Sequence, residues 1–134
     1  MSLKLSVLSP ERKLVESALV EEVTLPTSEG QIQVLPGHAA MIGLLETGVV
    51  SYRLSDGATV VGAVSTGTFE VKDDELAVLA ETLELAREID VARAQKAQKT
   101  AEDALRDAAL DEHSFRKYQL KLQRSLIRQQ IAGK

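Results

Sequence analysis

The sequence changes character near Glu81, and this change divides the chain into two parts. Before it, short apolar runs with alternating polar residues are separated by Pro, Gly and Asp, which is the pattern of β-strands joined by turns. After it, turn residues are almost absent and Ala, Glu, Arg, Lys, Gln and Leu dominate, a composition that favours α-helix. The sequence therefore predicts a strand-rich N-terminal part followed by a helical C-terminal part.

The N-terminal part contains at least seven candidate strands. Asp56-Gly57 lies between two apolar runs, and an Asp-Gly pair in this position is a strong signal for a β-hairpin. Asp73-Asp74 separates two further runs in the same way. Short strands at such regular spacing favour an antiparallel β-sandwich or barrel over a parallel sheet with crossover helices. The predicted strands span residues 3–7, 13–16, 19–25, 31–35, 49–54, 58–64, 68–72 and 76–80.

The C-terminal part predicts two helices. Asp90 is a suitable N-cap for a first helix that runs to about Ala109. Asp111 or Ser114 can start a second helix that ends near Ile131. Because the connection between them is short, we expect an antiparallel helical hairpin.

The first predicted helix carries a narrow seam of methyl groups. A buried carbon contributes about 0.8 kcal/mol, against roughly 1.5–3 kcal/mol for a fully buried Leu, so such a seam permits close approach but stabilises little. We therefore expect the hairpin to be docked weakly. A tight permanent contact is the alternative, since alanine is also the best helix former. The seam consists of Ala94, Ala97, Ala101, Ala104 and Ala108, at spacings of three and four.

The two parts differ in charge. We assign residues 1–86 to a β-sandwich domain and residues 87–134 to a helical hairpin domain. The formal net charge of the chain is −4, which separates into −8 for the first domain and +4 for the second. The first domain should therefore attract basic partners, and the second should attract acidic ones.

Basic residues follow one face of the second predicted helix. Like charges at spacings of three and four repel by a few tenths of a kcal/mol per pair, so the pattern costs helix stability unless an anionic partner is present. A solvated basic face is the ordinary explanation, and an acidic partner is the functional one. We call this set the basic stripe: Lys117, Lys121, Arg124 and Arg128.

The sequence lacks the residues and motifs that several classes of function require. Cys is absent, which excludes disulfides and thiolate chemistry. No phosphate-binding Gly-rich loop or paired metal-ligand spacing is present, and His38 and His113 have no neighbouring nucleophile of a known motif. No apolar run approaches the roughly 20 residues needed to cross a bilayer. We expect a soluble protein without a catalytic site or metal of its own.

Two blocks of sequence together resemble a known family. The first is Gly-x-Ile-x-Val-Leu-Pro-Gly-His-Ala over residues 30–39, and the second combines residues 66–71 with residues 76–80. They are similar to the signature of the epsilon subunit of F-type ATP synthases, of the bacterial type. The likeness runs in order over nearly the whole chain. It departs at Ala40, where the family often has proline, and at Thr66, where it has a glycine.

This resemblance implies a rotor subunit whose β-sandwich contacts the gamma subunit and the ring of membrane c subunits. Ser28, Gln31 and His38 would face these partners. The helical hairpin would detach and extend, so that its basic helix meets acidic segments of the catalytic α/β subunits and restrains ATP hydrolysis. The residues of that helix are Arg116, Lys117, Lys121, Arg124 and Arg128. The resemblance also implies a peripheral position at the cytoplasmic face of the bacterial inner membrane, reached only through the c ring.

A short motif implies that ATP binds as a regulatory ligand. The resemblance implies no required cofactor. Residues 89–94 resemble the Ile/Leu-Asp-x-x-Arg-Ala motif of family members that bind ATP. Forked guanidinium donors match phosphate geometry, and a carboxylate can accept hydrogens from a base or a ribose. The alternative is that Asp90 only caps a helix and Arg93 is a surface residue. The implied nucleotide-binding residues are Glu84, Ile89, Asp90, Arg93, Ala94, Arg124 and Arg128.

Two other functions compete with this interpretation. The basic helix could serve a nucleic-acid-binding module, or the sandwich could bind a small molecule without belonging to a complex. An acidic first domain and an aromatic content of only 3% argue against nucleic acid, because single-strand binding uses rings as stacking platforms. We therefore expect no nucleic-acid partner.

Overall fold

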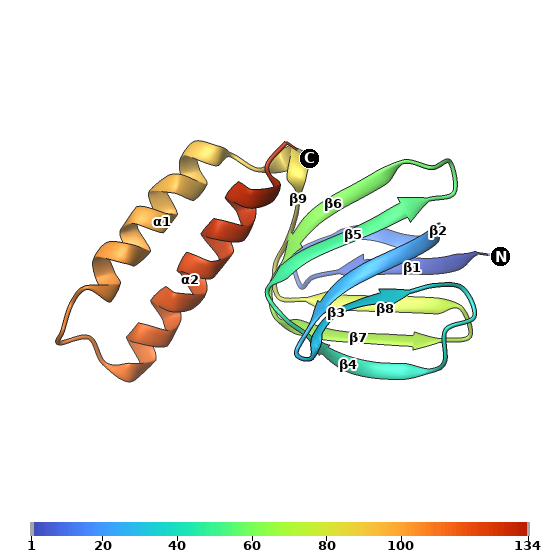
Figure 1. Ribbon diagram of the computed structural model, residues 1–134, viewed down its shortest axis with the longest axis horizontal. Helices are drawn as coiled ribbons and strands as arrows, with labels where there is room; N and C mark the ends of the chain where they lie inside the picture. Colours follow the sequence, from blue (N-terminus) through green and yellow to red (C-terminus); the bar gives the residue numbers. More distant parts are fainter. Residues whose placement is uncertain (1, 134) are drawn as a thin grey trace. The chain divides into compact units, whose positions relative to one another are not determined.

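The structure is a computed structural model that describes residues 2–133. The chain divides into two compact units, Met1–Leu85 and Ala86–Lys134. The first unit is built of strands, and the second contains a short 3-10 helix, η1 (Ala86–Glu88), and two α-helices, as Figure 1 shows. The fold class predicted from the sequence, a β-sandwich followed by a two-helix hairpin, is confirmed.

The first unit is a strongly bent sheet of nine strands. Hydrogen-bonded strands follow one another in the order β1-β8-β7-β4-β2-β5-β6-β9. In addition, β3 pairs with β2, and β1 pairs with β2. The strands are β1 (Leu3–Leu8), β2 (Lys13–Thr27), β3 (Gly30–Val34), β4 (Met41–Leu45), β5 (Gly48–Leu54), β6 (Thr59–Val64), β7 (Gly67–Lys72), β8 (Glu75–Ala80) and β9 (Leu83–Leu85).

The predicted strand pattern needs three corrections. Residues 13–16 and 19–25 form the single strand β2, which continues through Ser17 at a φ of 53°. The sheet is not antiparallel throughout, because β1 pairs β8 in parallel while it also pairs β2 antiparallel. This double pairing closes β1, β8, β7, β4 and β2 into a ring, and β5, β6 and β9 continue the sheet beyond β2. β4 and β9 were not predicted as strands; β4 exposes apolar residues on its outer face, and β9 has only three residues.

The core of the first unit follows from strict alternation. Leu3, Leu5 and Val7 of β1 are fully buried, while the residues between them are half-buried or exposed. With few rings in the sequence, branched aliphatic side chains fill most of the interior, and Phe69 is the largest of the fully buried side chains. Gly43 makes room for that ring, since a Cβ at this position would lie 2.5 Å from Phe69. The large side chain of Phe69 on β7 therefore requires a residue without a side chain at position 43 of β4.

The second unit contains the two predicted helices, α1 (Val91–Leu105) and α2 (Glu112–Ile131). The Asp90 carboxylate accepts the backbone N–H of Arg93 at 3.1 Å, so Asp90 is the N-cap of α1 as predicted. Of the two candidate starts for α2, Asp111 is the N-cap, and its carboxylate accepts the backbone N–H of Ser114 at 2.7 Å. The helix starts were therefore readable from the sequence.

The end of α1 was predicted too late, by four residues. The helix stops at Leu105 rather than Ala109, because the backbone N–H of Arg106 bonds to carbonyls in the last turn. The Asp107 carboxylate then accepts the backbone N–H of Ala109 at 2.9 Å and stabilises a turn instead of a further helical turn.

The alanine seam lies between the two helices. Ala94 and Ala101 are buried, and α2 is the main neighbour of α1 within the described residues. Gln129 donates from its side-chain amide to the Gln98 side-chain oxygen at 2.7 Å and so links the helices across the seam. Ala108 lies beyond the end of α1 and is exposed.

Candidate functional site

A groove on the helical hairpin brings several predicted site residues together. It has a volume of about 600 Å³ and is lined by residues of both α1 and α2. Arg93, Arg124 and Arg128, three of the predicted nucleotide-binding residues, are among them. The complete lining is Arg93, Lys96, Ala97, Thr100, Ala101, Tyr118, Lys121, Arg124, Ser125 and Arg128.

Helical spacing explains how the groove acquires its charge. On α2, Lys121, Arg124 and Arg128 follow one another at intervals of three and four and therefore share one face. On α1, Arg93 and Lys96 are three residues apart and contribute from the opposite wall. Small side chains of the seam lie between these long ones, so the floor of the groove stays open.

The groove is suited to an anion. Five of its lining residues are basic and none is acidic, so the potential within it is positive. Tyr118 is its one aromatic lining residue, and the Lys121 Nζ lies 5.4 Å from the centre of that ring. Arginine can bind phosphate with two parallel hydrogen bonds, and lysine binds it as a point charge. The arrangement can therefore hold a phosphate-bearing ligand.

The other predicted nucleotide-binding residues lie outside this groove. The Asp90 carboxylate caps α1, Ile89 precedes it and is half-buried, and Ala94 is buried in the seam. Glu84 belongs to β9 of the first unit, where it stands opposite Ala63 of β6. The groove thus unites the three arginines of the predicted set and none of its carboxylates.

The motif comparison missed several groove residues, of which Lys96 and Tyr118 have the largest side chains outside the basic stripe. Lys96 and Tyr118 belong to no quoted motif, yet both line the groove. The spacing of Lys96 after Arg93 on one predicted helix was the available signal. Tyr118 was harder to find, because a contact between two helices does not follow from the sequence of one.

The basic stripe on α2 overlaps the groove. Lys121, Arg124 and Arg128 belong to both, whereas Lys117 belongs to the stripe and does not line the groove. The Lys117 Nζ lies 5.8 Å from the centre of the Tyr118 ring. Arg116, the fifth predicted residue of the basic helix, forms an exposed ion pair of 2.8 Å with Glu112.

The predicted c-ring and gamma contacts divide between two ends of β3. Ser28 lies in the exposed turn before the strand and Gln31 near its start, whereas His38 lies in the loop after it. A strand of this length separates its ends by roughly 17 Å, so the structure does not bring His38 together with the other two. In its own loop, the Gly37 backbone N–H donates to the Asp74 carboxylate at 2.6 Å.

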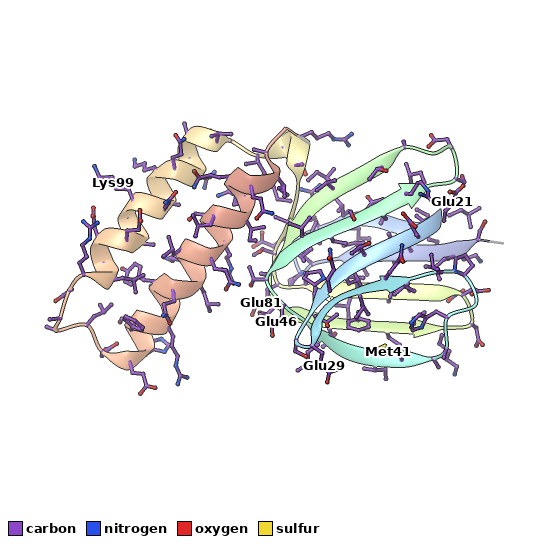
Figure 2. All side chains as sticks on the ribbon, viewed as in Figure 1. Glu21, Glu29, Met41, Glu46, Glu81 and Lys99 are labelled. Carbon is purple, nitrogen blue, oxygen red and sulfur yellow. The ribbon has the colours of Figure 1, made fainter. Side chains whose placement is uncertain are left out.

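The end of the sheet that carries Ser28 and Gln31 is acidic. Figure 2 shows Glu29, Glu46 and Glu81 gathered there, each from a different turn. The Glu46 backbone N–H donates to the carbonyl of Pro26 at 2.9 Å, which ties two of these turns together.

An exposed apolar patch lies on the outer face of β4, β7 and β8. Ile42 and Leu44 of β4 are 75% and 60% exposed, and Leu79 of β8 is 49% exposed. Leu44 stands opposite Thr68 of β7, which stands opposite Leu79, so these side chains share one row on one face. Contiguous apolar surface of this kind marks sites of protein contact.

Residues 2–133 contain neither a cluster of metal-ligating side chains nor a helix suited to span a membrane. No cluster of three or more His, Asp or Glu side chains in this part of the chain could hold a metal ion. Neither of the described α-helices combines the length and apolarity that a bilayer span requires.

Comparison with known proteins decides the family. A model of the beta-sandwich domain of the ATP synthase delta/epsilon chain matches residues 2–86, and a model of its long alpha-helix domain matches residues 87–133. The chain belongs to this delta/epsilon family. Among its relatives, the ATP synthase epsilon chain of Trichlorobacter lovleyi is 42% identical over 98% of this chain and 94% of the relative. That of Halalkalibacterium halodurans is 37% identical over 99% and 98%. The resemblance to the epsilon subunit is confirmed.

Solved structures share the delta/epsilon fold. A chain in the mitochondrial ATP synthase of Euglena gracilis, described as OSCP/F1/c-ring, superposes with a TM-score of 0.83 at 21% identity, over 93% of this chain and 78% of that one. A chain in the central stalk and c-ring structure of the Tetrahymena thermophila enzyme gives a TM-score of 0.57 at 15% identity, over 96% and 92%. At these identities the likeness concerns the fold alone.

Proposed function

We propose that this chain is a central-stalk subunit of a bacterial F-type ATP synthase, which couples the gamma subunit to the c ring and restrains ATP hydrolysis through its helical hairpin. The observation that carries this proposal is the match of both units, in order, to epsilon chains over 98% of the sequence. Such a subunit lies at the cytoplasmic face of the inner membrane and reaches the membrane only through the c ring.

The apolar patch on β4, β7 and β8 is our proposed contact for gamma. Burial of exposed aliphatic surface favours association between proteins, and Ile42, Leu44 and Leu79 are large apolar side chains exposed on this face. The loop that carries His38 leads directly into β4, so we assign His38 to the same contact.

The acidic end of the sheet is our proposed contact for the c ring. Ser28 and Gln31 are exposed there and can donate or accept hydrogen bonds, and the surrounding glutamates favour a basic loop on the partner. Charges at the edge of a contact mainly set orientation and association rate, so this end would position the subunit while the apolar patch supplies affinity.

The hairpin supplies regulation in this proposal. Its basic stripe binds acidic segments of the catalytic subunits in one state, and its groove binds ATP in the other. ATP shifts the balance only as far as its affinity for the two states differs. The subunit itself carries no catalytic residue; ATP is a regulatory ligand, and Arg93, Arg124 and Arg128 hold its phosphates.

Substitution of Leu44 by Asp tests the proposed gamma contact. A carboxylate on this face removes apolar area and adds a charge that must be desolvated, so co-purification of gamma with the tagged chain should fall at least tenfold. Leu19 is 50% exposed on β2, outside the patch, and Leu19→Asp is the matched control. Equal recovery of gamma with both variants would refute the assignment of this face.

A further inference from the structure

We propose that Asp74 is a positioning residue for the gamma contact. Its carboxylate holds the turn that ends at His38 in one of the two forms available to that turn, and so prepares the loop before β4 for the partner. This inference rests on the proposed function and adds a residue that sets the shape of the contact. Asp74 belongs to the turn between β7 and β8, which is far from His38 in the sequence.

The turn between β7 and β8 consists of two residues that both have a left-handed backbone. Asp73 and Asp74 have φ values of 52° and 58°, and Lys72 pairs with Glu75 on either side of them. Two-residue hairpin turns of this kind favour Asn, Asp or Gly, and glycine adopts such a conformation without steric cost. The backbone would therefore accept glycine at both positions, so what the Asp74 carboxylate adds lies in its contacts.

Asp74 binds two different segments of the chain. Its carboxylate accepts the backbone N–H of Gly37 at 2.6 Å. Its backbone carbonyl accepts the backbone N–H of Lys4 at 2.9 Å, where the parallel pairing of β1 with β8 begins. Asp74 is half-buried, whereas Asp73 is exposed, and within residues 2–133 no hydrogen bond joins Asp73 to the loop. The sheet therefore fixes Asp74, and the Asp74 carboxylate ties the loop to the sheet.

The N–H that Asp74 binds lies in the middle of a turn. The His38 backbone N–H donates to the Leu35 carbonyl at 3.1 Å, and Gly37 has a φ of 85°. With Pro36 in the second position, this is a type II turn. The hydrogen bond within such a turn does not use the N–H of its third residue. The Gly37 N–H is therefore available to an outside acceptor, and the Asp74 carboxylate takes it.

Loss of this acceptor would free the turn to change type. Types I and II differ in the orientation of the central peptide, because ψ of the second residue is about −30° in type I and about +120° in type II. Rotation of the Pro36–Gly37 peptide reverses the directions of its carbonyl and N–H, so the polar surface beside His38 differs between the two forms. A partner that binds one form has its affinity reduced by the fraction of chains in that form. The Asp74 carboxylate therefore raises the affinity for gamma by keeping the loop in the binding form.

Three single substitutions in the full chain test this inference. Asp74→Gly removes the carboxylate and leaves a residue that adopts the φ of the turn without strain. Asp73→Gly makes the same change at the other position of the turn, where no hydrogen bond to the loop is lost, and is the matched control. Asp74→Asn keeps an oxygen acceptor without its charge. Urea unfolding should place all three variants close to wild type, which separates an effect on the loop from a loss of folding.

The loop and the affinity for gamma are measured separately. In the free chain, NMR should show the Gly37 amide exchanging with water about tenfold faster in Asp74→Gly and at the wild-type rate in Asp73→Gly, because only the first variant lacks the acceptor. Purified gamma should bind Asp74→Gly about tenfold more weakly, which corresponds to the loss of one charge-assisted hydrogen bond. Asp74→Asn should lie between Asp74→Gly and wild type, since a neutral acceptor binds less strongly than a carboxylate.

The contrary outcomes are distinguishable. An unchanged Gly37 amide in Asp74→Gly would show that the carboxylate does not hold the turn. A freed amide with unchanged affinity for gamma would show that gamma does not depend on the form of this loop, and the inference is then wrong while the gamma contact stands. Equal weakening by Asp73→Gly would assign the effect to the turn rather than to the Asp74 carboxylate. If the wild-type chain does not bind gamma, the proposed function fails and the inference fails with it.

Discussion

Asp111 determines where the second helix begins. Its carboxylate accepts the backbone N–H of Ser114, and this hydrogen bond holds the pKa of Asp111 below the ordinary value of an aspartate. The Ser114 hydroxyl and nearby His113 act in the same direction, while slight burial opposes them. A lowered pKa in the folded state means that the cap stabilises the helix fully above the unfolded pKa and is lost as the pH falls through the folded value.

Removal of the Asp111 cap should weaken the helical hairpin. Substitution of Asp111 by Ala should reduce the thermal stability of the helices at neutral pH, because it removes the cap. In acid, below the pKa of the cap, wild type and variant should converge. Far-UV circular dichroism against temperature at both pH values measures this, and a difference that persists unchanged in acid would contradict the assigned cause.

Only some residues of the candidate site could be predicted from the sequence. Arg93, Arg124 and Arg128 were inferred from a motif and its associated positions, and the structure brings them into one groove. Lys96 and Tyr118 enter it through helix pairing, which depends on the register of two antiparallel helices rather than on either sequence alone.

At the scale of elements, the pairing of β7 with β8 leaves no room for a side chain at Gly67. Gly67 stands opposite Ala80, and a Cβ at Gly67 would lie 1.9 Å from the Leu79 carbonyl oxygen. The obstructing atom belongs to the backbone, so the neighbour cannot rotate away as a side chain could. The glycine is needed for this pairing.

Gly67→Ala should therefore destabilise the sandwich by more than about 2 kcal/mol, in the range of substitutions that force a backbone to move. Gly57→Ala is a useful comparison, since a Cβ there has nothing within 4 Å and only its φ of 92° opposes the change. That variant should lose roughly 1 kcal/mol. Urea unfolding of both variants measures the difference, and similar losses would rule out the steric explanation.

Elements with regular patterns were predicted better than those without. Alternation in β1 and the flanked turn at Asp56-Gly57 predicted strands that the structure confirms. β9 was missed because its three residues precede a helical composition, and the parallel pairing of β1 with β8 was missed because the two strands are far apart in sequence. Local patterns predict elements, whereas closure of a bent sheet depends on long-range pairing.

At the scale of the whole molecule, charge and fold change at the same point. Residues 1–86 carry a net charge of −8 and contain all the described strands, whereas residues 87–134 carry +4 and contain both described α-helices. This division allows one part to stay fixed in a complex while the other binds anions, and it underlies the proposed function. The separation of His38 from Ser28 and Gln31 follows from β3, which the sequence analysis placed between them at residues 31–35 and the structure places at Gly30–Val34.

Truncation after residue 86 tests the division of labour most directly. The two forms of the chain would be reconstituted with gamma and the catalytic α/β assembly, and the rate of ATP hydrolysis would be measured alongside recovery of gamma. We predict that the truncated chain still recovers gamma as well as the full chain does, while hydrolysis rises because the basic stripe is gone. An unchanged hydrolysis rate with gamma recovered would contradict the regulatory role of the hairpin, and loss of gamma would contradict the role of the sandwich.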